Sequence, residues 1–152
     1  MKPFTVSFFG HRKIYEWDVI EEKLSRIVTD VIKKNESVVF LIGRQGEFDE
    51  YAASVIKGIK KRYDTYDCGL ILVLPYTVAD IEYYSKYYDD IVIPECADSA
   101  HPKAAAGLKN QYMIDASDLV VFYVREKGGA YKALQYAISQ RKKIVNIADE
   151  NK

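Results

Sequence analysis

Glycine and arginine occur together in three short segments, each directly after an apolar run of the chain. The segments are Gly10-His11-Arg12, Gly43-Arg44-Gln45-Gly46 and Arg125-Glu126-Lys127-Gly128-Gly129. Glycine has no Cβ, so it allows a ligand to come close to the backbone. Arginine binds phosphate or carboxylate through two parallel hydrogen bonds. This shared composition predicts a site for a small anion, and we expect a phosphate-bearing ligand.

The second and third segments also stand where helices are expected to begin. Gly46 and Gly129 would lie at helix N-termini, where unpaired N–H groups and the helix dipole favour phosphate. The plainer alternative is that the glycines only form strand-to-helix turns and that the arginines are solvated. For any single loop that alternative is the stronger one. Three such loops at one edge of a sheet favour a ligand site, which Ala130 would extend.

Other polar side chains stand close to these loops in the sequence. Glu47 and Asp49 follow Gly46. In the first turn of a helix they would interact with its dipole, or one of them would bind a ribose hydroxyl or assist cleavage at an anomeric carbon. His11 would hydrogen-bond a phosphate or a base, or hold the turn. Asn110 precedes the fifth apolar run and is a further candidate ligand contact.

The motifs of common cofactor sites are absent from the sequence. GxGxxG does not follow the first apolar run, and GxxxxGK followed by Ser or Thr occurs nowhere. An NAD-dependent oxidoreductase and a P-loop NTPase therefore lack support. Cys68 and Cys96 stand far apart, without the spacing of a zinc site. We expect no cofactor and no metal.

Apolar runs alternate with amphipathic stretches along the chain. The apolar runs predict strands at residues 4–9, 37–42, 69–75, 91–94, 118–124 and 143–147. Apolar residues at steps of three and four predict helices at 16–34, 47–63, 103–115 and 128–140. Several strands are apolar throughout, which is typical of a parallel sheet covered by helices on both faces. The expected fold is α/β, a Rossmann-like three-layer sandwich with a mostly parallel central sheet, in a single domain over residues 1–152.

Composition limits the class of partner. Lys plus Arg and Asp plus Glu number 22 each, for a formal net charge of zero. A duplex-binding protein usually carries a basic surplus, so the charge balance disfavours nucleic acid as a partner. No apolar run is long enough to cross a bilayer and none resembles a signal peptide, so we expect no membrane partner and a cytoplasmic location.

Tyrosine is abundant in this chain, with 13 residues in all. Tyr83 and Tyr87 are four residues apart, as are Tyr84 and Tyr88, so each pair would share one side of a helix. We expect these rings to form a packed surface or a subunit contact, in preference to a base-stacking platform. So much amphipathic surface favours a homo-oligomer.

Several stretches resemble the SLOG superfamily, in particular its small bacterial members of the YspA/YpsA type. The resemblance extends from Phe4 to Ile147 and is weak over 75–102. It is strongest in GHR, in GRQGEFDEYA and in SDLVVFYV with the following GGA and YA. It implies a Rossmann-like fold that binds nucleotides or nucleotide-derived ligands. Other members of the superfamily are the LOG phosphoribohydrolases and the DNA-processing protein DprA.

The resemblance also bears on catalysis. In LOG enzymes the motif PGGxGTxxE holds a phosphate, and its glutamate serves hydrolysis of the N-glycosidic bond. Aligned on the paired glycines, this chain has Lys132 at the threonine and Gln135 at the glutamate. Glutamine cannot act as a carboxylate base. The comparison therefore favours a phosphate-binding role for Gly128 and Gly129 over catalysis of the LOG type.

These observations together predict binding of a nucleotide or nucleotide-derived phosphorylated ligand at the carboxyl edge of the sheet, for example in a sensor. The alternative is an N-glycosidase or phosphoribohydrolase that uses Asp49, which matches the family motif, or Glu47. A weaker alternative is a nucleic-acid adaptor. The predicted ligand-binding residues are Gly10, His11, Arg12, Gly43, Arg44, Gly46, Asn110, Arg125, Gly128, Gly129 and Ala130.

Overall fold

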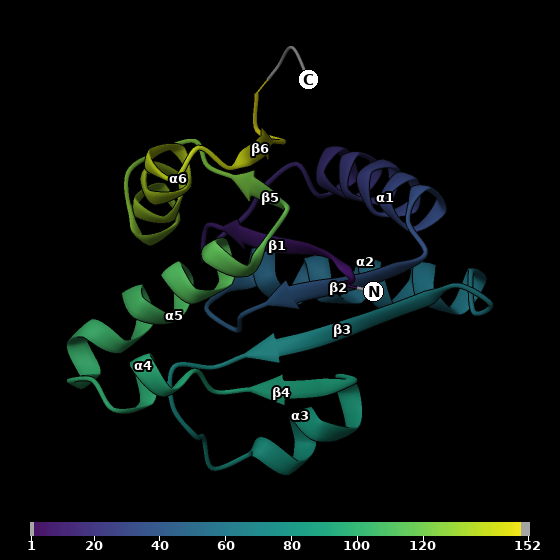
Figure 1. Cartoon of the computed structure of the whole chain (residues 1–152). Helices are drawn as coiled ribbons and strands as arrows, with labels where there is room; N and C mark the ends of the chain where they lie inside the picture. The colour runs from purple at the N-terminus through teal and green to yellow at the C-terminus, as the bar shows by residue number, and fades with distance from the viewer. Residues whose placement is uncertain (1, 150–152) are drawn as a thin grey trace.

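One sheet of six parallel strands forms the centre of the molecule (Figure 1). The structure is a computed structural model that describes residues 2–149. The strands are β1 (Phe4–Gly10), β2 (Ser37–Ile42), β3 (Asp67–Val73), β4 (Asp90–Val92), β5 (Leu119–Tyr123) and β6 (Lys143–Asn146). Their order is β4-β3-β2-β1-β5-β6, with parallel pairing throughout. The predicted fold class is confirmed.

Helices cover both faces of this sheet. They are α1 (Trp17–Lys34), α2 (Glu47–Arg62), α3 (Ile81–Tyr87), α4 (Glu95–Asp98), α5 (Pro102–Ala116) and α6 (Gly129–Ser139). Val6 and Phe8 of β1 pack in one apolar cluster with α1 and α2, whereas Phe9 packs in a second cluster with α5 and α6. Successive side chains of a strand point to opposite faces, so the two clusters are the two interfaces of a three-layer sandwich. Within residues 2–149, no helix has the length and apolar content that crossing a bilayer requires.

Two short helices, α3 and α4, lie outside the helices that the apolar periodicity predicts. Helix α3 spans seven residues, and none of them is buried. A helix without a buried stripe leaves no periodic apolar signal in the sequence. The paired tyrosines at 83/87 and 84/88 do lie on or directly after this helix, as their spacing indicates.

The order of the strands reverses between β1 and β5. From β1 the chain proceeds outward to β4, and it then returns through α5 to place β5 on the other side of β1. Gly10 pairs with Tyr123 where these two strands end. The helices that follow the two strands, α1 and α6, lie on opposite faces, so a crevice opens between them. In open parallel sheets this switch point is where ligands bind.

Candidate functional site

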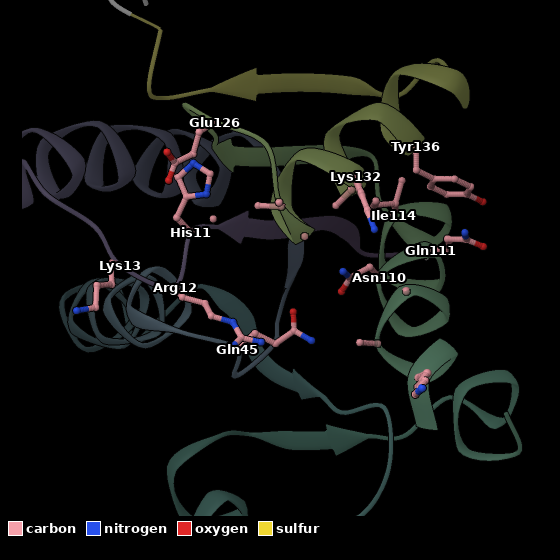
Figure 2. Close-up of a pocket in the computed structure, with 18 of the residues that line it drawn as sticks. His11, Arg12, Lys13, Gln45, Asn110, Gln111, Ile114, Glu126, Lys132 and Tyr136 are labelled. Atoms are coloured by element: carbon pink, nitrogen blue, oxygen red, sulfur yellow. The ribbon is translucent and has the colours of Figure 1, made fainter. Parts of the chain in front are cut away.

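A pocket of about 830 Å³ lies at this edge of the sheet (Figure 2). We call it the edge pocket. The end of β1 and the loop after it form one side, while α5 and the first turns of α6 form the other. Of the residues predicted to bind ligand, the structure brings seven together in its lining: Gly10, His11, Arg12, Asn110, Gly128, Gly129 and Ala130.

The remaining predicted residues do not line the edge pocket. They are Gly43, Arg44, Gly46, Arg125 and the two carboxylate residues, Glu47 and Asp49. Sequence reasoning also missed polar residues that do line it: Lys13, Gln45, Lys103, Gln111, Glu126, Lys132 and Tyr136. Three of these carried a signal, because Gln45 and Glu126 stand inside predicted loops and Lys132 follows the paired glycines by one helical turn.

Gly10 is required by packing at the end of β1. A Cβ added there would lie 2.2 Å from Cγ of Phe48, and two further atoms of Phe48 would lie within 2.6 Å. The Phe48 side chain is fully buried and stacks on Tyr123, with ring centroids 6.1 Å apart. The glycine therefore makes room for the first turn of α2, in addition to lining the edge pocket.

The N-terminus of α2 is closed by the loop after β1. The Glu47 N–H donates to the carbonyl oxygen of Arg12 at 2.8 Å, and the Phe48 N–H donates to that of His11 at 3.4 Å. Gly46 allows this close approach, because a Cβ on it would lie 2.3 Å from the Arg12 Cα. These two donors are thus used within the protein and are not presented to the edge pocket.

The N-terminus of α6, in contrast, opens into the edge pocket. Gly128 precedes the helix with φ of 155°, a conformation that a side chain disfavours. A Cβ added at Gly128 or Gly129 would meet no atom within 4 Å. The first helical hydrogen bond is donated by Lys132 to Gly128, so the N–H groups of residues 129–131 precede it and have no intrahelical acceptor. They are the donors that an anion in the pocket can reach.

Most charged residues in the lining of the edge pocket are cationic. Arg12, Lys13, Lys103 and Lys132 line the edge pocket, and Glu126 is the one carboxylate among its lining residues. Figure 2 shows Arg12 on the side of the β1 loop, whereas Lys132 comes from α6 on the other side. Cations placed around free backbone N–H groups favour an anionic ligand.

Asn110 supplies a neutral acceptor in the lining. Its Oδ1 is buried and has no hydrogen-bond partner among the described residues. The side chain extends from α5 toward the interior of the edge pocket (Figure 2). A buried carbonyl oxygen without a donor is costly, so a ligand N–H that reaches it gains a favourable contact.

His11 is held in one orientation by β5 and the loop after it. Its Nε2 accepts a hydrogen bond of 2.8 Å from the Arg125 N–H, and its ring lies edge-on to Tyr123 with centroids 5.9 Å apart. Because Nε2 is an acceptor here, the ring proton is on Nδ1. His11 can therefore donate to a phosphate through Nδ1 while it ties the two switch-point loops together.

The two predicted arginines outside the lining have partners elsewhere. The Arg125 guanidinium forms an ion pair with Glu16, whose carboxylate also accepts from the Tyr123 hydroxyl at 3.1 Å. Arg44 donates to the Tyr84 hydroxyl at 3.3 Å and lies over its ring, 5.3 Å from the centroid. Arg125 thus fixes the loop behind His11, and Arg44 points toward α3.

The two candidate catalytic carboxylates also have structural partners. Oε1 of Glu47 accepts from the Ile14 N–H at 2.9 Å, and Oδ2 of Asp49 accepts from the Gln45 N–H at 2.9 Å. These hydrogen bonds hold the loop after β1 and the loop after β2 against the start of α2. The edge pocket contains neither carboxylate in its lining, so no geometry for their attack on a bound glycosidic bond is present.

Asp49 and Lys109 of α5 are both buried and interact electrostatically, and the exposed fractions of the two residues are 7% and 1%. Burial raises the pKa of Asp49, against the lowering effects of the Lys109 ammonium and the Gln45 N–H. Burial also lowers the pKa of Lys109 to about 8, against the opposite effect of Asp49. A Cβ at Gly43 would lie 2.7 Å from Nζ of Lys109, so this glycine leaves room for the pair.

The described residues hold no group of three or more His, Cys, Asp or Glu side chains that could bind a metal ion.

Comparison with known proteins supports the fold. No family model and no curated protein matches the chain. The structure is similar to DNA processing protein A (DprA) from Helicobacter pylori, with a TM-score of 0.61 and 15% sequence identity. The match covers 93% of this chain and 64% of that one, so this chain spans somewhat less than two thirds of the neighbour's length.

This likeness corrects one expectation from the sequence. The neighbour was studied for its mode of binding single-stranded DNA. The argument that zero net charge disfavours nucleic acid as a partner is therefore wrong for this fold. The physical reason is that net charge is a sum over the whole surface and does not report where cations gather on it.

Proposed function

We propose that the edge pocket binds single-stranded nucleic acid through its phosphate groups. The observation that carries this proposal is the open N-terminus of α6, in a pocket at the switch point of a parallel sheet whose lining includes four cationic residues. Free N–H groups and basic side chains are the donors with which proteins hold a phosphate backbone. The similarity in fold to a protein that binds single-stranded DNA points the same way.

The concave shape of the site favours a single strand over a duplex. A duplex presents its phosphates on a convex surface, whereas the edge pocket is a hollow of about 830 Å³ between two helices and a loop. A single strand can turn one nucleotide into such a hollow. The amide side chains of Gln45, Asn110 and Gln111 then supply hydrogen-bonding groups for a base edge.

Fluorescence anisotropy with a labelled oligothymidylate tests the proposal. Arg12→Ala and Lys132→Ala are each expected to weaken binding and to reduce the slope of log affinity against log salt by about 0.7, the value for one lost phosphate contact to a single strand. Arg26→Ala and Lys34→Ala are matched controls, because both residues are exposed on α1 and pair only with neighbouring carboxylates. Equal affinities for all four variants would contradict the proposal.

A free nucleotide is the second candidate ligand. Its support is the unpartnered Oδ1 of Asn110 beside a hollow whose volume lies in the range of small-molecule pockets, roughly 300–1,000 Å³. Competition distinguishes the two candidates. A nucleoside monophosphate that displaces the oligonucleotide at micromolar concentration supports the small ligand, whereas displacement only at millimolar concentration supports the strand.

We also propose that residues 1–152 form one domain of the SLOG type, of the small YspA/YpsA-like group. The support is the resemblance of the glycine-containing segments, together with a sheet that includes every described strand. Limited proteolysis tests the single domain: a single protected fragment close to full length is expected, and two stable fragments would contradict it.

A further inference from the structure

A second hollow lies away from the edge pocket and has no part in the function proposed above. It has a volume of about 330 Å³ and is bounded by the C-terminal half of α2 and the end of α3. We call it the lysine hollow. Four lysines line it, together with two aspartates and two tyrosines: Lys57, Lys60, Lys61, Lys86, Asp64, Asp89, Tyr87 and Tyr88.

The charges of the lysine hollow do not cancel. Lys60 forms an ion pair of 2.7 Å with Asp89 and also donates to the carbonyl oxygen of Cys68. Lys57 donates to the carbonyl oxygen of Tyr87 at 2.6 Å. Lys61 and Lys86 are exposed, and their side chains have no hydrogen bond or ion pair among the described residues. The four lysines carry four positive charges, and Asp64 and Asp89 carry two negative ones, so two positive charges remain in excess.

Aromatic rings continue from the lysine hollow along α3. The Lys57 ammonium lies 3.7 Å from the centroid of the Tyr87 ring, and the rings of Tyr87 and Tyr88 are 5.0 Å apart. Tyr84 follows at 6.2 Å from Tyr88, and Tyr83 at 5.3 Å from Tyr84. Tyr83 is 66% exposed, so one of its faces is open for stacking.

At the end formed by Tyr83 and Tyr84, this row of rings lies beside the loop after β2. Arg44 lies over the Tyr84 ring and donates to its hydroxyl. The next residue, Gln45, lines the edge pocket. Cations and rings therefore follow one another from the edge pocket to the lysine hollow. We call the surface of Arg44, Tyr83, Tyr84, Lys61 and Lys86 the α3 track.

We infer that the α3 track binds the continuation of the strand that enters the edge pocket. This inference rests on the proposed function and adds to it a second site and a direction across the surface. Basic side chains that follow a phosphate backbone, with exposed rings on which bases stack, are the two elements of single-strand binding without sequence preference. Tyr83 would stack on a base, while Arg44, Lys61 and Lys86 would each contact a phosphate.

Oligonucleotide length separates the two sites experimentally. An oligothymidylate of about 4 nucleotides fills the edge pocket alone, whereas one of about 20 nucleotides also reaches the α3 track. The double variant Lys61→Glu/Lys86→Glu is expected to bind the long oligomer about tenfold more weakly, with a salt slope smaller by about 1.4, and the short oligomer unchanged. Tyr83→Ala is expected to weaken only the long oligomer, by about tenfold.

The matched control is Arg26→Glu/Lys34→Glu, which changes the net charge equally at two exposed positions of α1. Unchanged binding of the long oligomer by the Lys61/Lys86 variant overturns the α3 track, and the edge pocket then stands if Lys132→Ala weakens both lengths. If Lys132→Ala changes the binding of neither length while the Lys61/Lys86 variant weakens the long oligomer, the edge pocket fails. The α3 track then binds a strand by itself, and its role as a continuation of the edge pocket is overturned. A wild-type protein that binds neither oligomer refutes both.

Discussion

The packing of Gly10 against Phe48 leads to a prediction that separates a structural from a ligand-binding cause for this glycine. Non-bonded carbon atoms prefer separations of about 3.5–4.0 Å. In Gly10→Ala the new methyl group would lie 2.2, 2.5 and 2.6 Å from three atoms of Phe48. The ring cannot withdraw, because it is fully buried and stacked on Tyr123. We expect a loss of about 3 kcal/mol in the free energy of unfolding, the upper end for overpacking.

A double-mutant cycle in urea tests this cause. Phe48→Ala alone is expected to cost about 3–5 kcal/mol, because it leaves a cavity. It also removes the atoms that the Gly10→Ala methyl group would meet. The double variant should therefore be about as stable as Phe48→Ala. Its loss of stability should be smaller than the sum of the two single losses by a coupling energy of about 2–3 kcal/mol.

Strictly additive losses in the cycle would refute this reasoning. So would a Gly10→Ala protein that unfolds at the wild-type urea midpoint. If such a protein had also lost oligonucleotide binding, the glycine would be required for the ligand and not for packing. Anisotropy on the same four proteins, performed below the unfolding transition, separates these results.

Four further predictions concern Lys109 and three glycines. Lys109 has a folded pKa of about 8, below its unfolded value of about 10.4. Between these pH values the unfolded chain binds more protons, so stability should rise by about 2 kcal/mol from pH 7 to pH 9.5 relative to Lys109→Met. Equal pH profiles in urea titrations of the two proteins would contradict this. Gly46→Ala should be destabilised by about 2 kcal/mol, because its Cβ would meet the Arg12 backbone. Gly58→Ala, in open space on the same helix, should gain about 0.5–1 kcal/mol in thermal unfolding. Gly128→Ala should lose about 1 kcal/mol, because φ is 155° there, and should bind oligothymidylate more weakly by anisotropy.

Much of the fold could be predicted from the sequence, because its local signals are strong. The run LVVFY of β5 is buried at every position, as a strand covered on both faces should be. The stripe of Ile20, Leu24 and Val28 on α1 is likewise buried. Helix α3 could not be found in the same way, since it buries no residue of its own.

The candidate site was predicted only in part, because contacts between distant segments decide it. The sequence treats Gly46 and Gly129 alike, as glycines at helix starts. In the structure the first N–H groups of α2 are taken by carbonyl oxygens of the β1 loop, whereas those of α6 face the edge pocket. No local pattern distinguishes the two cases. The prediction from net charge about nucleic acid was wrong for a similar reason, because net charge does not report where on the surface the lysines lie.

The two sides of the edge pocket differ in how many substitutions the fold tolerates. On the β1 side, main-chain hydrogen bonds fix the loop and Gly10 and Gly46 are crowded, so substitutions of these two glycines disturb the fold itself. On the α6 side, Gly128, Gly129 and the neighbouring Gly107 of α5 face unoccupied space. Homologues can therefore acquire new ligand preferences by exchanging residues on α5 and α6 alone. Selection for a different ligand would change residues of those two helices, while Gly10 and Gly46 stay fixed by packing.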